Sequence, residues 1–257
     1  MQLFEGDCLE VMKQIPDASV DLVLCDLPYG TTQCKWDSVI PFAPLWASYR
    51  RVIKPFAPVV LTASQPFTSA LIMSNIEWFK YCWIWEKDNA SNFFAAKFQP
   101  LNNTEDVVVF SAGGCNNGTK NAVPYFPQGL ESVEIKHTNG KNVGGLVGVA
   151  HKTAMKEGRE YTQTQKGYPL KTLKFTRDSG KTHPTQKPIA LMEYLIRTYT
   201  LSGALVLDNT MGSGSTGVAC ANTGREFIGI EQDPKYFQIA KSRVDEALAE
   251  YELFGEK

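Results

Sequence analysis

Residues 20–30 have the sequence VDLVLCDLPYG, an apolar run that stops abruptly at an acid, a proline, an aromatic and a glycine. The apolar part predicts a strand buried on both faces of a parallel sheet. The break predicts a loop at the carboxyl end of that strand, where open α/β sheets bind their ligands. There Asp26 offers a carboxylate and Tyr29 a flat π-face, which together suit a planar heterocycle carrying an amino group. Taken alone, these residues fit an ordinary turn with a buried tyrosine equally well.

A second stretch, residues 205–217, has the sequence LVLDNTMGSGSTG, which predicts a strand, a glycine-rich turn and the start of a helix. Residues 227–231, FIGIE, then predict a strand that ends at Glu231. Glycines let a backbone approach a ligand closely, and an acid at the end of the next strand can bind ribose hydroxyls. The combination predicts a site for an adenosine-containing cofactor. The alternative is a tight turn followed by a surface glutamate.

Strands and helices are expected to alternate along the chain. The strands are expected at residues 1–4, 20–25, 59–62, 81–85, 107–110, 205–208 and 226–231, and the helices at 9–15, 41–52, 64–75, 188–199, 215–223 and 234–251. Alternation of this kind predicts a doubly wound, mostly parallel sheet. Asp7 and Ser64 are expected to cap the first and third helices. Residues 89–97 are polar, aromatic and long for a turn, which favours a mobile flap.

Length and composition favour one large α/β domain with an insertion, because the chain has 257 residues, of which 43% are hydrophobic. The domain is expected to comprise residues 1–111 and 183–257, and the insertion the glycine-interrupted residues 112–182. No long apolar run or basic leader is present, which predicts neither a membrane span nor secretion. The six cysteines form no C-x-x-C pair, so we expect no metal site and a reducing cytoplasm.

Charge is distributed unevenly along the sequence. Lysines and arginines outnumber acids by seven in residues 120–187, whereas residues 1–119 and 188–257 each carry a net charge of −4. A basic segment between two acidic ones favours contact with a polyanion, made by lysines such as Lys152, Lys156, Lys166 and Lys171. A solvated, lysine-rich loop is the alternative.

Three motifs, in this order, resemble those of the beta-class, permuted amino-methyltransferases of DNA, which use S-adenosylmethionine to methylate exocyclic amino groups of bases. Residues 26–29, DLPY, resemble that family's catalytic D-P-P-Y motif. Residues 183–188, HPTQKP, resemble its H-P-T-Q-K-P segment, and residues 208–216, DNTMGSGST, its D-P-F-x-G-S-G-T-T cofactor motif. The resemblance covers roughly residues 1–110 and 183–245. It implies a Rossmann-like methyltransferase fold with an inserted target-recognition region.

The resemblance also implies roles for individual residues. The catalytic residues would be Asp26, Leu27, Pro28 and Tyr29. The cofactor-binding residues would be Asp7, Cys8, Thr185, Lys187, Asp208, Thr210, Gly212, Gly214, Ser215, Thr216 and Glu231. Leu27 stands where the family has proline, and Asn209 and Thr210 stand where it has proline and phenylalanine. Asp7 is equally well explained as a helix cap, and Lys187 as a phosphate contact.

The implied reaction is methyl transfer from S-adenosylmethionine to the exocyclic N6 of adenine in double-stranded DNA, after the base has left the duplex. A carboxylate at position 26 favours adenine, since cytosine-N4 enzymes of this kind more often carry serine there. Cytosine N4 and RNA remain alternatives, as do a nucleotide-dependent oxidoreductase and a non-catalytic DNA-binding module. The resemblance leaves open a homodimer and a cognate restriction enzyme that is not in direct contact.

Overall fold

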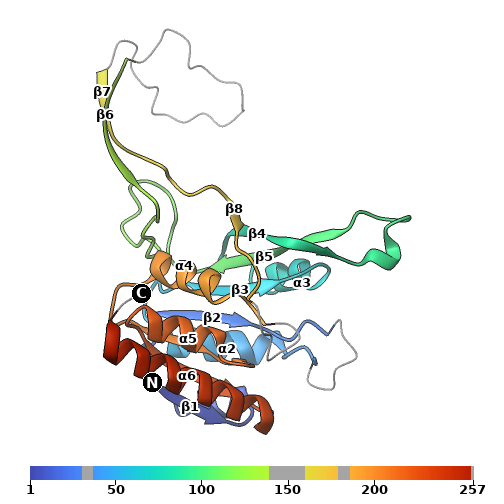
Figure 1. Cartoon of the computed structure of the whole chain (residues 1–257). Coiled ribbons are helices and arrows are strands. Elements are labelled where there is room, and N and C mark those ends of the chain that lie inside the picture. The colour runs from blue at the N-terminus through green and yellow to red at the C-terminus, as the bar shows by residue number, and fades with distance from the viewer. Residues whose placement is uncertain (31–36, 139–159, 179–185, 256–257) are drawn as a thin grey trace. The chain divides into compact units, whose positions relative to one another are not determined.

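The computed structural model describes residues 1–30, 37–138, 160–178 and 186–255. The chain forms two compact units, one of Met1–Phe126 with Lys171–Lys257 and the other of Pro127–Leu170. The larger unit is built on a sheet with the strand order β1-β10-β9-β2-β3-β5-β4-β8 (Figure 1). Its strands are β1 (Gln2–Glu5), β2 (Leu22–Asp26), β3 (Val59–Ala63), β4 (Phe79–Ser91), β5 (Asn102–Phe110), β8 (Thr172–Lys174), β9 (Leu205–Asp208) and β10 (Glu226–Glu231).

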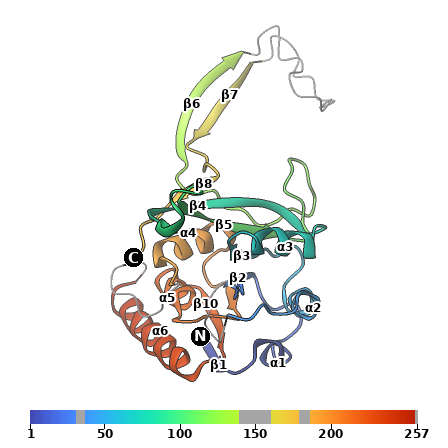
Figure 2. The same cartoon turned by 90° about the vertical axis from the view of Figure 1, so that its right-hand side faces the viewer.

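Helices cover both faces of this sheet (Figure 2). They are α1 (Cys8–Met12), α2 (Phe42–Val52), α3 (Phe67–Ser74), α4 (Ile189–Tyr199), α5 (Ser215–Asn222) and α6 (Pro234–Phe254). The strand β2 shows how two cores arise, because its side chains alternate between the faces. Val23 and Cys25 pack into the core that contains α1, α2 and α3, whereas Leu22 and Leu24 pack into the one that contains α4 and α5. The predicted doubly wound α/β fold is therefore confirmed.

The sheet is mostly parallel, as expected, with one exception. β1, β10, β9, β2 and β3 pair in parallel, but β5 runs antiparallel to both β3 and β4. β4 and β5 form a hairpin that is longer than the strands predicted at 81–85 and 107–110. Residues 89–97, predicted as a flap, contain the end of β4 and the 3₁₀ turn η1 (Phe93–Ala95). The polar composition of these residues concealed the strand, since an exposed hairpin needs no apolar face.

Helix boundaries follow the sequence signals in one case and depart from them in another. Asp7 caps α1, where its carboxylate accepts hydrogen bonds from the backbone N–H groups of Leu9 and Glu10. The expected cap at Ser64 is wrong, because α3 begins at Phe67 behind Pro66, which offers no capping side chain. The described helices include none with the length and apolar character needed to cross a membrane.

The smaller unit contains a two-stranded antiparallel hairpin of β6 (Glu131–Thr138) and β7 (Glu160–Lys166). His137 and Tyr161 stack across the two strands with their ring centroids 5.0 Å apart. This unit lies within the segment 112–182 predicted as an insertion. Lys152 and Lys156, expected to contact a polyanion, lie outside the described residues.

Candidate active site

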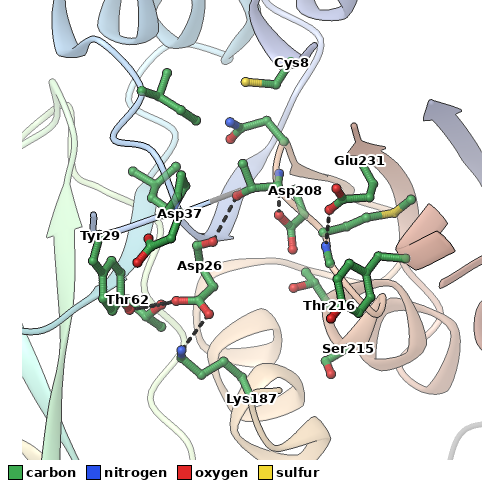
Figure 3. Close-up of a pocket in the computed structure, with 18 of the residues that line it drawn as sticks. Cys8, Asp26, Tyr29, Asp37, Thr62, Lys187, Asp208, Ser215, Thr216 and Glu231 are labelled. Atoms are coloured by element: carbon green, nitrogen blue, oxygen red, sulfur yellow. Dashed lines mark hydrogen bonds and ion pairs between the residues drawn. The ribbon is translucent and has the colours of Figure 1, made fainter. Parts of the chain in front are cut away.

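A cavity of about 450 Å³ lies at the carboxyl edge of the parallel strands, and residues of both predicted motifs line it. Asp26, Tyr29 and Glu231 belong to its wall (Figure 3). Gly212 lines it as well. They meet because β2 pairs in parallel with β9, and β9 with β10, so that the ends of these strands share one edge. The two stretches that the sequence singled out therefore face a single space.

Asp26 ends β2, and its carboxylate makes three polar contacts inside the protein. Its Oδ1 accepts hydrogen bonds from the Tyr29 hydroxyl at 2.7 Å and from the Thr62 hydroxyl at 2.5 Å. Its Oδ2 lies 2.6 Å from the ammonium of Lys187. A carboxylate has about four acceptor positions. One position is left for a ligand, and it is on Oδ2, while the side chain remains 26% exposed.

Lys187 belongs to a buried group of alternating charges. Its ammonium lies between Asp26 and Glu105, 3.3 Å from the Glu105 carboxylate, and the other oxygen of Glu105 lies 2.6 Å from the ammonium of Lys87. Burial by itself would lower the pKa of Lys187, but the Asp26 and Glu105 carboxylates raise it above its ordinary value. Lys187 is therefore a cation at neutral pH. With only 7% of its side chain exposed, it is poorly placed to contact a DNA phosphate.

Tyr29 lies beside Asp26, in the loop that follows β2. One face of its ring stacks on Phe67, with the ring centroids 5.1 Å apart. The Lys187 ammonium lies 5.7 Å from the centroid of the same ring. Burial, together with the charge of Asp26, raises the pKa of the Tyr29 phenol well above its ordinary value. The phenol therefore stays protonated and serves as a hydrogen-bond donor that fixes the carboxylate.

Thr210 connects the two motifs. Its hydroxyl donates a hydrogen bond of 3.0 Å to the backbone carbonyl of Asp26, and its backbone N–H donates one of 3.0 Å to the carboxyl of Asp208. Burial raises the pKa of Asp208 to about 7, although a hydrogen bond from Thr216 opposes the shift. Thr210 stands where the resemblance led us to expect phenylalanine, and it joins the end of β9 to the end of β2.

The glycine-rich turn leaves room beside the cavity. Gly212 has a φ of +52°, and a Cβ added there would meet nothing within 4 Å. Gly214 has a φ of +81° and caps α5, where an added Cβ would lie 3.0 Å from Ala240. Ser215 is buried, lines the cavity, and has a hydroxyl with no hydrogen-bond partner. The turn thus offers open space and an unused polar group to a ligand.

Glu231 ends β10 beside this turn. Its Oε2 accepts a hydrogen bond from the Gly212 N–H at 2.9 Å, and its Oε1 accepts one from the Asp233 N–H at 2.8 Å. Burial raises the pKa of the Glu231 carboxyl. Each oxygen keeps a second acceptor position, so the carboxylate can receive two hydroxyl groups from the cavity.

Asp7 and Cys8 line the same cavity from the start of α1. The capping bonds use Oδ1 of Asp7. The capping role and a role in binding a ligand are therefore compatible, since the carboxylate has a second oxygen. Thr185, also predicted to bind the cofactor, lies outside the described residues.

Several polar residues of the site were not predicted. Thr62, Glu105, Lys87 and Tyr49 carry much of its hydrogen bonding, with Tyr49 donating a 2.6 Å hydrogen bond to the Asn209 side chain. Thr62 could have been found, because it ends the strand predicted at residues 59–62, the next strand after β2 along the chain. Glu105 could not, since it lies in the part of β5 that carries no apolar pattern.

This shared cavity, on a doubly wound sheet, is the arrangement expected of an S-adenosylmethionine-dependent methyltransferase of bases. The chain belongs to the DNA methylase family N6_N4_Mtase, which matches residues 20–242.

Relatives and solved structures agree with this assignment. The type II methyltransferase M.HinfI of Haemophilus influenzae is 26% identical over 271 residues, covering 95% of this chain and 68% of the relative. The type II methyltransferase M2.DpnII of Streptococcus pneumoniae is 33% identical over 121 residues, covering 47% of this chain and 44% of the relative.

The structure of M1.HpyAVI in complex with S-adenosylmethionine has a TM-score of 0.61 and 27% identity, covering 94% of this chain and 98% of that one. The cytosine-N4-specific PvuII DNA methyltransferase has a TM-score of 0.64 at 16% identity, covering 99% of this chain and 93% of that one, and shares the fold.

The residues present fit the cofactor of this family, S-adenosylmethionine. The unpartnered Ser215 hydroxyl and the open space at Gly212 suit the amino-acid part of the cofactor, and the spare acceptor positions of Glu231 suit two ribose hydroxyls. When bound, S-adenosylmethionine supplies an electrophilic methyl group carried on a sulfonium.

Proposed function

We propose that this enzyme methylates the exocyclic N6 of adenine in double-stranded DNA. The observation that carries the proposal is the carboxylate of Asp26, which keeps an acceptor position on Oδ2 and lies in the same cavity as Gly212 and Glu231. An exocyclic amino group has two N–H bonds to donate, and a strand-end carboxylate beside an aromatic ring suits it. The base must leave the duplex to reach such a cavity.

The chain's own residues would act by orientation and electrostatics. The amino nitrogen of adenine is a weak nucleophile, because its lone pair is delocalised into the ring. When Asp26 and the Leu27 carbonyl accept its N–H bonds, the nitrogen moves towards tetrahedral geometry and its lone pair becomes available. Methylation leaves a positive charge on this nitrogen until one of its protons departs, and the Asp26 carboxylate stabilises that charge. Tyr29 would stack on the base.

Lys187 would hold the Asp26 carboxylate in place. Its ammonium lies 2.6 Å from Oδ2 and fixes the orientation of the carboxylate. Glu105 in turn balances the charge of Lys187. This arrangement supports a role at the catalytic carboxylate for a lysine that the sequence motif had assigned to the cofactor.

Cytosine N4 is the second candidate substrate, because a cytosine-N4-specific enzyme shares the fold. Asp26 favours adenine, since the resemblance associates serine with cytosine enzymes at this position. Sequencing the DNA of cells that express the protein, with a method that detects modified bases, tests the choice. N6-methyladenine at a fixed sequence is the expected result. N4-methylcytosine in its place would assign the enzyme to the second candidate substrate.

We propose further that the segment 112–182 reads the DNA sequence, and that the enzyme works in a prokaryotic cytoplasm. The proposal also includes that the enzyme forms a homodimer, and that a cognate restriction enzyme accompanies it without direct contact. Light scattering on the purified protein tests the dimer, and exchange of residues 112–182 with those of a relative tests recognition through a change in the methylated sequence.

A further inference from the structure

The β4–β5 hairpin projects beyond the edge of the sheet where the cavity lies. Asp26 on β2 aligns with Thr62 on β3. Thr62 aligns in turn with Val107 on β5, and Val107 with Trp83 on β4. From Trp83, β4 continues for eight residues to Ser91, which is roughly 25 Å of strand at about 3.3 Å per residue. Figure 1 shows the hairpin extending past the neighbouring strands on the side to which β2 points.

The tip of this hairpin exposes three phenyl rings. The exposed fractions of Phe93, Phe94 and Phe98 are 67%, 91% and 90%. The tip is nevertheless regular, because the N–H groups of Phe98 and Gln99 both bond to the Ala95 carbonyl, at 2.8 and 3.0 Å. Exposed apolar side chains that cluster together often mark a binding surface.

The charge of the tip suits a polyanion. Residues 89–104 contain no Asp or Glu and one cation, Lys97, among asparagines, a serine and a glutamine. The acids at the root of the hairpin are paired: Asp88 lies 3.2 Å from Arg177, and Glu86 lies 3.4 Å from Lys174. Asp106, farther from the tip on β5, accepts a hydrogen bond from the Thr68 hydroxyl. The tip itself, residues 89–101, presents no carboxylate to phosphate groups.

The root of the hairpin forms part of the cavity wall. Trp85, Lys87 and Glu105 line the cavity, and the Lys87–Glu105 ion pair ties β4 to β5 at that level. A duplex whose target base enters the cavity must lie against this edge of the sheet. The phenyl rings at the tip are then within reach of the same duplex.

We propose that the hairpin tip, residues 89–101, contacts the DNA duplex beside the target base, with its phenyl rings against bases unstacked when the target leaves the helix. The proposal rests on the proposed function. Aromatic side chains stack on exposed bases whatever their sequence, and apolar side chains can wedge between base steps. A second copy of the chain would also accept phenyl rings, but it would not account for the amides, the lysine and the lack of acids.

Kinetics provide the first test. In the combined variant Phe93→Ala, Phe94→Ala and Phe98→Ala, the KM for unmethylated genomic DNA should rise about tenfold, with S-adenosylmethionine affinity and thermal unfolding unchanged. The matched control, Leu253→Ala with Phe254→Ala on α6, removes side chains that are 74% and 79% exposed and should behave as wild type. An unchanged KM for DNA in the phenylalanine variant overturns the proposal.

Crosslinking provides a test that does not depend on methyl transfer. With the photo-reactive p-benzoylphenylalanine in place of Phe94, irradiation in the presence of genomic DNA should attach the protein to DNA; in place of Phe254 it should not. Crosslinks between two protein chains instead of DNA would assign the tip to a dimer and overturn the proposal. If the wild type transfers no methyl group, the proposed function fails, while the crosslink still decides whether the tip touches DNA.

Discussion

Three of the roughly four acceptor positions of the Asp26 carboxylate are used inside the protein, by Tyr29, Thr62 and Lys187. The carboxylate is thereby fixed in orientation before any ligand arrives. Preorganised acceptors of this kind stabilise developing charge without reorganising during the reaction. A single residue predicted from a four-letter motif therefore depends on a neighbour from the same motif and on neighbours from two other segments.

Substitution of Lys187 tests whether the fixed orientation of the Asp26 carboxylate contributes to catalysis. Lys187→Met should lower kcat at least about tenfold, because Oδ2 loses its cation, while the Kd for S-adenosylmethionine changes less than about threefold. The matched control is Lys174→Met, which removes an exposed lysine 3.4 Å from Glu86 and should leave both quantities unchanged. A large loss of cofactor affinity with kcat intact would instead assign Lys187 to the carboxylate of the cofactor.

Asp208 gives the protein a specific pH dependence. Its pKa is about 7 in the folded chain, against an ordinary value of 3.8, so the folded state binds this proton more tightly. The stability that it contributes is present at low pH and is lost as pH rises from about 4 to about 7. Relative to Asp208→Asn, the free energy of unfolding of the cofactor-free wild type should therefore fall by up to about 4 kcal/mol across this window. Urea denaturation measures it, and parallel pH profiles would contradict the assignment.

At the scale of elements, the turn between β9 and α5 depends on a glycine for two reasons. Gly214 adopts a φ of +81°, and its missing Cβ lets Ala240 of α6 approach. Gly203 has a φ of +77° but open space around it. The two glycines therefore share a backbone conformation and differ in packing.

Alanine substitutions separate these reasons. Gly203→Ala should lower the free energy of unfolding by about 1–2 kcal/mol through backbone strain alone. Gly214→Ala should cost a further 1–3 kcal/mol or so, because α6 must move away, and should weaken cofactor binding. Thermal unfolding of both variants provides the measurement. Equal losses would show that the contact with Ala240 adds nothing.

The sequence predicted those elements whose local pattern of apolar residues matches their burial in the fold. β2 and β9 were found because buried parallel strands are continuously apolar, and the site followed because such strands end at one edge. The extended part of β5 was missed because its residues are polar, and Glu105 was missed with it. Tyr49 was missed for a different reason: its partner, Asn209, is distant in sequence.

At the scale of the whole molecule, the basic segment between two acidic ones predicts strongly salt-dependent DNA binding. The logarithm of the affinity should fall linearly with the logarithm of the salt concentration. Lys166→Gln and Lys171→Gln should each reduce the slope by about one, whereas Lys241→Gln, at an i,i+4 ion pair on α6, should not. Titrations of DNA at several salt concentrations provide the slopes. A flat response in the wild type would remove the basic segment from the interface.

The most direct test is to measure cofactor binding and methyl transfer together in Asp26→Ala. The variant should bind S-adenosylmethionine with the affinity of the wild type, but form at least about a hundredfold less N6-methyladenine in DNA. Glu231→Ala, from the other wall of the same cavity, should instead lose cofactor affinity. Wild-type amounts of N6-methyladenine from Asp26→Ala, or loss of its cofactor binding, would contradict the division of the cavity into a base side and a cofactor side.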